Sequence, residues 1–328
     1  MALEQIENSA PDGLLVVCAS FEERRCREVV QRASGYKAKC TVVLNFNSSS
    51  GKSGSKKQED SVIFLLDRLR LLDVRGIPRL ISVDPYDFFG LWFLLTDELN
   101  RHGFGWGSMT ATIDISCLTK VQMIFLLREI LLTGALTKCR LVYTVPESYN
   151  RERGDKFSWL SVGYFDPVVF PIRAEYRATT SRRRVALALL GHEGQRTLTA
   201  WRHVDPDETI LLFARSDNER MMEISRREND FLIAHIGGDG HENFLNCNFL
   251  DIIGARDMVA ERLRDIEEQG NVTLSFIPFG PKPMVVGALM AILEARRADV
   301  ELVYPIPISY NPEYSGGAKD VFFFDFLG

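Results

Sequence analysis

The sequence lacks the short patterns that usually mark a metal site. Its six cysteines form no CxxC pair, and none stands near a histidine at zinc-ligand spacing. Its five histidines show no HxxxH, HxH or HxxE spacing. Most of the cysteines lie inside apolar runs, where a free cysteine behaves as a small hydrophobic residue. We therefore expect no metal and no cofactor, and a reducing, cytoplasmic compartment.

Long hydrophobic runs and a strong net charge are also missing. No apolar run reaches the ~20 residues that a membrane span needs, and the amino-terminal MALEQIENSAPDG has neither the basic nor the apolar region of a signal peptide. The net charge of −5 argues against binding a long nucleic acid but leaves room for a small basic pocket. With 21 Phe and 4 Trp to bury, the 328-residue chain should be globular, with one large or two mid-sized domains and no membrane contact.

What the sequence does contain is a repeat. LVYTVPESYN at residues 141–150 returns as LVYPIPISYN at residues 302–311, with seven of ten positions identical at an offset of 161. Similar blocks flank both copies in the same order: LLVVCASFEERR and VALALLGHEGQR before them, FSWLSVG and VFFFDFLG after them. We therefore predict a tandem duplication, with domains over residues 1–172 and 185–328 and a basic linker over residues 173–184.

Each copy alternates short apolar runs, typical of buried strands, with longer segments of helical period. The first copy has the strand-like runs LLVVCA, TVVLNF, RLISV, ATIDI and RLVYTV, and helical spacing over Ser61–Leu72 and Phe88–Leu99. This alternation predicts an α/β fold: two tandem Rossmann-like parallel-sheet domains that pack as a pseudo-dimer. The polar GSKKQED segment after Gly51 predicts a flexible insertion, and FLIAHI predicts a strand followed by a turn at Gly237.

Ligands of open parallel sheets bind beyond the carboxyl ends of the strands. In both copies these ends carry small, hydroxyl, amide and cationic groups that can hydrogen-bond phosphate, ribose or a base edge. We therefore expect one nucleotide-type ligand between the strand ends of the two copies. The predicted ligand residues are Ser20, Phe21, Glu22, Asn45, Asp84, Ser116, Thr119, Lys120, Ser148 and Asn150 in the first copy, and His192, Arg215, Gly280, Lys282, Ser309 and Asn311 in the second.

The turn that ends at Lys120 stands out among these segments. Thr119 and Lys120 begin an apolar helix, where free backbone N–H groups, a hydroxyl and an ammonium together suit an anion. The second copy offers Gly280-Pro-Lys282 before its own helix. The alternative is that Thr119 merely caps the helix and Lys120 is solvated.

This pattern resembles the CRISPR-associated Rossmann-fold (CARF) sensor domains. Asp114-Ile-Ser followed by Thr119-Lys120 and an apolar helix is similar to the family's fourth strand and its Gly-Gly-Thr-Lys-like loop, although copy one has no glycines there. The resemblance implies binding of cyclic oligoadenylates across a two-fold interface. The related SAVED sensors of anti-phage systems fuse two CARF-like units in one chain, which implies a role in antiviral defence.

Two repeated residues leave the function open. Glu22 and Arg25 in the first copy correspond to Glu193 and Arg196 in the second. They can form a structural salt bridge, or Glu can recognise a base or ribose while Arg contacts phosphate. The main hypothesis is a sensor or regulatory subunit that oligomerises or controls a separate effector protein.

The alternative hypothesis is an enzyme that hydrolyses a nucleotide or nucleic-acid bond, of phosphodiesterase or glycosyl-hydrolase type, with one active copy. Its candidate catalytic residues are Glu22, Asp114, His192 and Glu193. A third hypothesis is a scaffolding subunit whose strand-end clefts are filled by bulky side chains.

Overall fold

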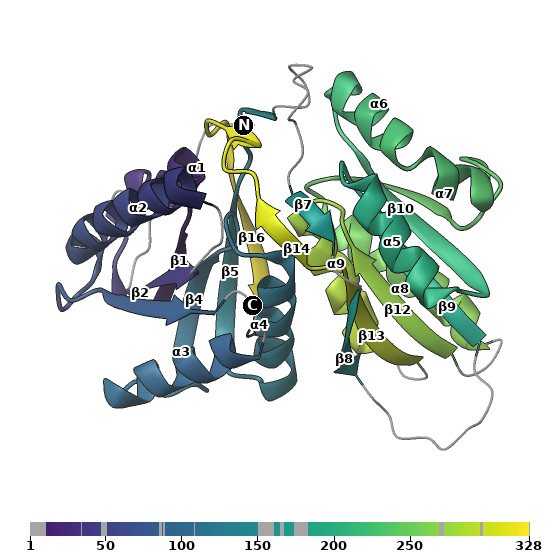
Figure 1. The fold of residues 1–328 in the computed structure, drawn as a ribbon. Coiled ribbons are helices and arrows are strands. Elements are labelled where there is room, and N and C mark those ends of the chain that lie inside the picture. Colours follow the sequence, from purple (N-terminus) through teal and green to yellow (C-terminus); the bar gives the residue numbers. More distant parts are fainter. Residues whose placement is uncertain are drawn as a thin grey trace. The chain divides into compact units, whose positions relative to one another are not determined.

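The structure is a computed structural model that describes residues 11–33, 35–46, 51–84, 87, 89–107, 109–149, 161–164, 167–173, 183–268, 272–295 and 298–327. It has two compact units (Figure 1). The first unit combines Met1–Ser161 with Ser309–Gly328, and the second consists of Val162–Ile308. Each unit is built around a mixed sheet of mostly parallel strands, so the chain is an α/β protein.

The sheet of the first unit has six strands in the order β16-β5-β4-β1-β2-β3. Its strands are β1 (Asp12–Ala19), β2 (Ala38–Phe46), β3 (Arg79–Val83), β4 (Met109–Asp114), β5 (Leu136–Thr144) and the antiparallel β16 (Val321–Leu327). Its helices are α1 (Glu23–Gln31), α2 (Gly51–Leu72), α3 (Gly90–Arg101) and α4 (Lys120–Thr133). In Figure 1, α1 and α2 cover one face of this sheet and α3 and α4 the other. Because both faces are covered, the central strands are apolar almost throughout.

The sheet of the second unit has six strands in the order β11-β10-β9-β12-β13-β8. Its strands are β9 (Arg183–Leu190), β10 (Glu208–Arg215), β11 (Phe244–Asn248), β12 (Val272–Pro278), β13 (Ala298–Tyr304) and the antiparallel β8 (Val168–Arg173). Its helices are α5 (Gly194–Val204), α6 (Glu219–Glu228), α7 (Asp230–His235), α8 (Ile252–Glu268) and α9 (Lys282–Glu294). No helix in the described ranges is long and apolar enough to cross a membrane.

Small strands complete the fold. The pair β6 (Ser148–Tyr149) and β15 (Ser315–Gly316) is antiparallel and belongs to the first unit. A second two-stranded sheet joins β7 (Ser161–Tyr164) to β14 (Pro307–Tyr310). Of the predicted linker, Arg173 ends β8, Arg183 and Arg184 begin β9, and residues 174–182 lie outside the described ranges.

The edge strand of each sheet comes from a distant part of the chain. The sequence comparison placed residues 321–328 in the second copy, but β16 pairs with β5 of the first unit, from Val321 opposite Thr144 to Leu327 opposite Cys139. The strand β8 takes the corresponding place beside β13. When the five parallel strands of each sheet are numbered in chain order, both sheets have the same spatial order. An antiparallel edge strand comes first, and the fifth, fourth, first, second and third parallel strands follow it.

Two local predictions are wrong. The polar GSKKQED segment is not a flexible insertion but part of the first half of α2, because lysine, glutamine and glutamate favour a helix that is exposed on one side. The FLIAHI segment is not a strand, because all of it except the last residue lies in helix α7. The glycines after it form the expected turn, with positive φ values of 97° at Gly237 and 89° at Gly238. The third strand of the second sheet is instead β11.

The returning strand leads to a prediction about stability. The Phe326 side chain on β16 is 5% exposed, whereas Phe231 on α7 is 50% exposed. We expect Phe326→Ala to lower the free energy of unfolding by about 3–5 kcal/mol, because it empties a packed site. Phe231→Ala should change it by less than about 1 kcal/mol. Urea unfolding followed by circular dichroism compares the two variants, and equal effects would show that β16 contributes little to the core.

Candidate functional site

In both sheets the first and fourth strands lie side by side. The strand β1 pairs with both β2 and β4, and β9 pairs with both β10 and β12. The loops that follow these two central strands therefore lead to opposite sides of the sheet. The space between two such loops is where an open parallel sheet offers a crevice to a ligand. The loops at this crevice are residues 20–22 and 115–119 in the first unit and residues 191–193 and 279–281 in the second.

In the first unit the crevice holds the side chain of Arg25, which is 7% exposed. Its guanidinium donates to Glu22 Oε1 at 2.7 Å, to the carbonyl oxygen of Thr144 at 3.0 Å and to that of Ser116 at 3.1 Å. The guanidinium carbon lies 5.7 Å from the centre of the Tyr143 ring. This one side chain therefore ties together the carboxyl ends of β1, β4 and β5.

In the second unit Arg196 has the corresponding position and is 1% exposed. Its guanidinium donates to Glu193 Oε2 at 2.9 Å and to the carbonyl oxygen of Pro305 at 2.7 Å. The guanidinium carbon lies 4.6 Å from the ring centre of Phe279 and 4.7 Å from that of Tyr304. Two aromatic faces, a carboxylate and a carbonyl thus replace the water that the charge would otherwise bind.

The two arginines are held by equivalent groups. The residue after the repeated LVY motif is Thr144 in one copy and Pro305 in the other, and its carbonyl oxygen accepts a hydrogen bond from the arginine of its own unit. The tyrosine of the motif packs on the guanidinium in both units. These are the contacts of a buried structural ion pair, which is one of the two interpretations that the sequence left open. Ligand recognition by the same residues stays a prediction.

The charge of Arg25 is secure despite its burial. Burial by itself would lower the pKa of this guanidinium, but the Glu22 carboxylate and the nearby Tyr143 outweigh burial and raise the pKa well above its ordinary value. The group therefore stays protonated at any pH at which the protein is folded. A permanent cation at the strand ends holds Glu22 as its carboxylate partner.

The predicted catalytic residue Asp114 is completely buried. Its Oδ1 accepts the backbone N–H of Ser116 at 2.8 Å and also the Ser116 hydroxyl, while Ser116 Oγ accepts the N–H of Thr144 at 2.8 Å. These bonds close the turn after β4 and join it to the end of β5. The side chain of Asp114 therefore shapes the backbone of the loop and presents no oxygen to solvent.

The predicted anion contacts lie at two helix starts. Thr119 is the N-cap of α4, because its Oγ1 accepts the backbone N–H of Gln122 at 3.3 Å. Lys120 follows it and is half-buried. In the second unit Pro281 precedes α9, and Lys282 is the first residue of that helix and also half-buried. Each sheet thus has a lysine at its carboxyl edge, next to the crevice that the arginine fills.

Other predicted residues are also placed at the carboxyl edge of the first unit. Ser20 Oγ accepts the N–H of Glu22 at 3.1 Å, and Asn45 Oδ1 accepts from Gln58 at 2.7 Å. Phe21 is half-buried and Asp84 is exposed. Ser148 lies on β6, and Asn150 lies outside the described residues.

The remaining predicted residues belong to two different units. His192 is half-buried, Gly280 is buried and Arg215 is exposed at the end of β10. Ser309 and Asn311 belong to the first unit rather than to the second, because the chain returns to the first unit after Ile308. The structure therefore brings the repeated SYN motifs into one unit instead of placing one at each sheet.

Sequence reasoning missed the packing role of the glycines around His192. A side chain at Gly191 would collide with the carbonyl oxygen of Phe279, and one at Gly194 with that of Glu228. The GxxG spacing was a visible signal, since only glycine permits such close backbone approaches. These glycines bring the loop after β9 against the loop after β12 and against the end of α6.

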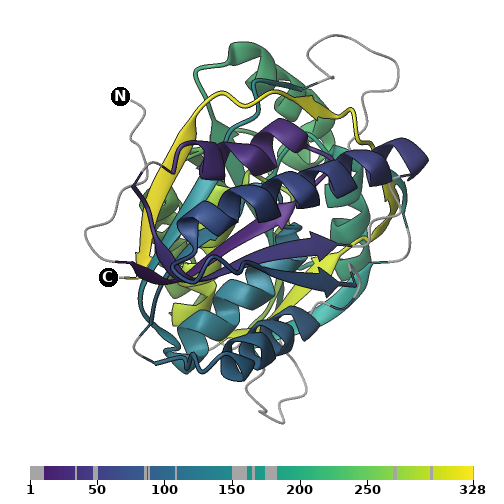
Figure 2. The same ribbon diagram turned by 90° about the vertical axis from the view of Figure 1, so that its left-hand side faces the viewer.

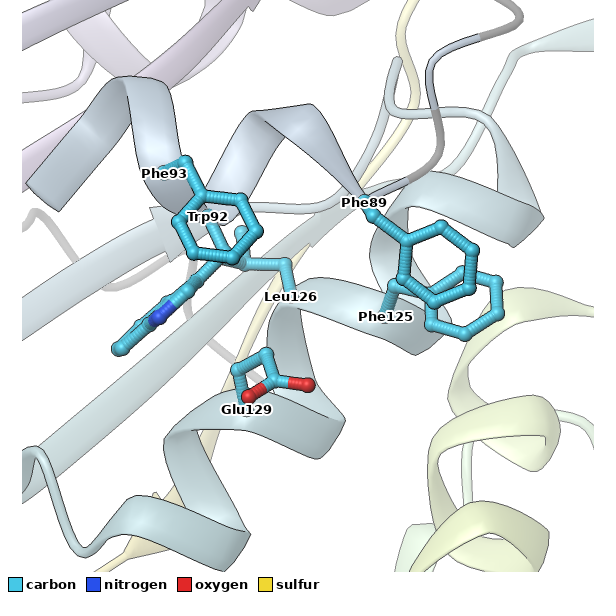
Figure 3. Close-up of a pocket in the computed structure, with 6 residues that line it drawn as sticks. All are labelled: Phe89, Trp92, Phe93, Phe125, Leu126 and Glu129. Atoms are coloured by element: carbon cyan, nitrogen blue, oxygen red, sulfur yellow. The ribbon is translucent and has the colours of Figure 1, made fainter. Parts of the chain in front are cut away.

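A further pocket lies between α3 and α4. It encloses about 100 Å³ and is lined by Phe89, Trp92, Phe93, Phe125, Leu126 and Glu129. Figure 3 shows the rings in two groups, with Leu126 and Glu129 between them. Arg128 pairs with Glu129, and Trp92 stacks on Trp106 at 4.7 Å. Sequence reasoning did not find this pocket, because its aromatic residues have the spacing of an ordinary amphipathic helix face.

The acidic, histidine and cysteine side chains do not converge on a metal site. Among the described residues no three such side chains lie close enough to hold an ion. The six cysteines are all free thiols. Burial raises the pKa of Cys26 to about 11 and that of Cys139 to about 12, so these thiols are poor nucleophiles at neutral pH.

The buried ion pair gives a prediction for the second unit. Arg196→Met should lower the free energy of unfolding by about 3–5 kcal/mol, because it leaves the Glu193 carboxylate buried without its cation. The double variant Arg196→Met/Glu193→Met should be clearly more stable than Arg196→Met alone. The matched control is Arg256→Met, which removes the surface pair with Asp257 and should change stability by less than about 1 kcal/mol. Urea titrations measure all three, and a double variant no more stable than the single one would contradict the pairing.

The thiol pKa values give a second prediction. Unfolded cysteines ionise near pH 8.5, whereas Cys26 and Cys139 stay protonated in the folded protein up to about pH 11–12. The folded state therefore binds more protons, and the free energy of unfolding should fall as the pH rises from about 8.5 towards 11. A thiol-specific chromogenic reagent at pH 8 should label these residues only after denaturant is added. Rapid labelling of the native protein at either position would show that the thiol is accessible and ionised.

Comparison with known proteins gives no assignment. No protein-family model matches the chain, and no curated protein matches its sequence significantly. The geometry of the strand ends is therefore the basis for any functional conclusion: a buried arginine in each crevice, with a lysine at the neighbouring helix start.

Proposed function

We propose that the chain is a non-catalytic sensor or regulatory subunit that binds an anionic, nucleotide-type ligand at the carboxyl edges of its sheets. One observation supports this most strongly: the strand-end acids are held in structural contacts, and in each unit a half-buried lysine lies beside them at the start of the next helix. Glu22 and Glu193 each pair with an arginine, and Asp114 closes a turn. Lys120 and Lys282 then supply the positive charge for phosphate groups.

The proposal includes an internal duplication. It is supported by the common strand order of the two sheets and by the equivalent contacts of Arg25 and Arg196. A duplicated sensor agrees with the resemblance to CARF and SAVED proteins, from which we take cyclic oligoadenylates as the ligand class and anti-phage defence as the setting. Free cysteines throughout the chain agree with a reducing, cytoplasmic environment.

The hydrolase alternative receives less support from the site. A general acid or base needs a carboxyl or imidazole group that can reach the substrate and exchange a proton. Asp114 is 0% exposed and Glu193 is 8% exposed, and both are engaged with neighbouring backbone or arginine groups. His192 is half-buried, and a lone histidine does not make a hydrolytic site.

A scaffolding role is a second candidate, favoured by one observation. In the second unit Arg196, Phe279 and Tyr304 pack together inside the crevice, and each is at most 5% exposed. A crevice filled by the protein's own side chains is expected of a subunit that only presents its surface to partner proteins. The two candidates differ in a single measurable property, the binding of a small anionic ligand.

The test measures thermal stabilisation by linear and cyclic oligoadenylates. At a ligand concentration 100 times Kd, binding should add about 2.7 kcal/mol to stability and raise Tm by about 5 °C. The double variant Lys120→Ala/Lys282→Ala should lose most of this shift, whereas Lys138→Ala, which removes an exposed lysine of β5, should keep it. An undiminished shift in the double variant would reject the lysine site, and no shift in the wild type would favour the scaffold.

Mass spectrometry separates the sensor from the enzyme. After incubation with cyclic and linear oligoadenylates the sensor should return them unchanged, and native spectra of freshly purified protein should show a bound nucleotide. Conversion to shorter or linear products that disappears in His192→Ala would establish the hydrolase instead.

A further inference from the structure

The segment Asn311–Asp320, here called the strap, crosses the carboxyl edge of the first unit. Starting at the end of β14, it passes α2, where Glu313 pairs with Lys57, and then the loop after β1, where the Ser315 hydroxyl donates to Glu22. It ends beside β5, where Lys319 N–H donates to Val145 O. Figure 2 shows this yellow segment passing α1, whose N-cap residue is Glu22.

The strap is held by fewer contacts than the edge strand that follows it. After Asp320 the chain enters β16, which is paired with β5 along its length and buries Val321 and Phe326. The contacts before Gly317 include the two-residue strand β15, the Ser315–Glu22 hydrogen bond, the packing of Tyr314 on Tyr149 and the exposed Lys57–Glu313 pair. A segment without a long strand pairing opens locally more easily than a strand that is paired along its length, so we expect the strap to open at a lower free energy than β16 does.

A hinge lies between these two parts. Gly317 has a φ of 72°, in the left-handed region that suits glycine, and it follows Gly316. A pair of glycines permits the backbone to rotate without moving β16. Residues 311–316 can therefore lift off the sheet edge as a loop between β14 and β16, while both of these strands stay paired.

The strap already occupies partners that the ligand is predicted to use. Glu22 accepts the Ser315 hydroxyl, and Ser148 is the strand partner of Gly316. The Tyr314 ring, which is 6% exposed, packs 5.3 Å from that of Tyr149. A hydroxyl on a carboxylate and a ring against a ring are the contacts that a ribose and a base would make there.

We propose that the strap is an autoinhibitory cover of the first unit's ligand site, and that the ligand displaces it by taking over its contacts with Glu22 and Tyr149. Displacement of residues 311–316 about Gly317 is then the structural signal of binding, which a partner protein reads. This inference rests on the proposed function, because it concerns access to the same site.

The first experiment needs no ligand. Hydrogen exchange of the full chain should show that amides of residues 311–316 exchange at least about tenfold faster than those of β16, since the strap opens alone. Exchange of both segments at one common rate would overturn the proposal, because the strap would then open only when the whole unit unfolds.

The second experiment weakens the strap and measures binding of cyclic tetra-adenylate by calorimetry. Glu313→Gln/Ser315→Ala removes both polar contacts and should lower Kd by roughly 3- to 30-fold, because a larger fraction of the protein is already open. The matched control Asp97→Asn removes an exposed ion pair with Arg101 on α3 and should leave Kd unchanged.

The third experiment closes the strap. Ser148 and Gly316 are antiparallel partners, whose Cα atoms lie about 4.5–5.5 Å apart in such ladders, within the range for a disulfide. The oxidised form of Ser148→Cys/Gly316→Cys should bind at least about tenfold more weakly than its own reduced form. Equal Kd values for opened, closed and wild-type proteins would reject the cover and leave the proposed function standing. Absence of binding in all of them, including the opened variant, would instead reject both.

Discussion

The guanidinium group buried at the carboxyl edge of each sheet is the constraint on which the strand-end architecture depends. Removing a charge from water is costly unless charged and polar partners replace the water. Arg25 meets that requirement with Glu22 and two carbonyl oxygens, and Arg196 with Glu193, one carbonyl and two aromatic rings. Because the carbonyls come from the ends of other strands, the arginine determines how those loops meet. Lysine has no planar fork with which to bridge several acceptors at once, so arginine suits this position.

The same constraint limits the chemistry that the strand ends can perform. An acid that neutralises a buried cation is not available to move protons, so the repeated glutamates support the structure first. A half-buried lysine also lies at the carboxyl edge of each sheet, Lys120 at the start of α4 and Lys282 at the start of α9. Under the proposed function these lysines bind the ligand, and the strap on the first unit is the part that responds to it.

The sequence predicted the local structure well and the long-range pairing poorly. Apolar runs bounded by polar turns marked the strands, since strands covered on both faces must be apolar. The repeated Glu-x-x-Arg spacing was visible, yet Arg25 bonds a carbonyl 119 residues away, and no local pattern reveals that partner. The return of β16 to β5 was missed for the same reason, because an antiparallel edge strand has a similar composition whichever sheet it joins. The errors at α2 and α7 were local, where polar or short apolar segments suit either a helix or another structure.

The position of β16 along the chain also determines which of the two units is completed first during translation. The second unit, Val162–Ile308, is complete before the ribosome reaches β16, whereas the first unit still lacks its edge strand. Nascent chains normally fold their amino-terminal domain first, but here the later unit finishes earlier. During that interval the edge of β5 has unsatisfied backbone groups and is open to incorrect strand pairing. A strand that closes a sheet from far along the chain therefore leaves that edge uncovered for as long as the intervening unit is being made.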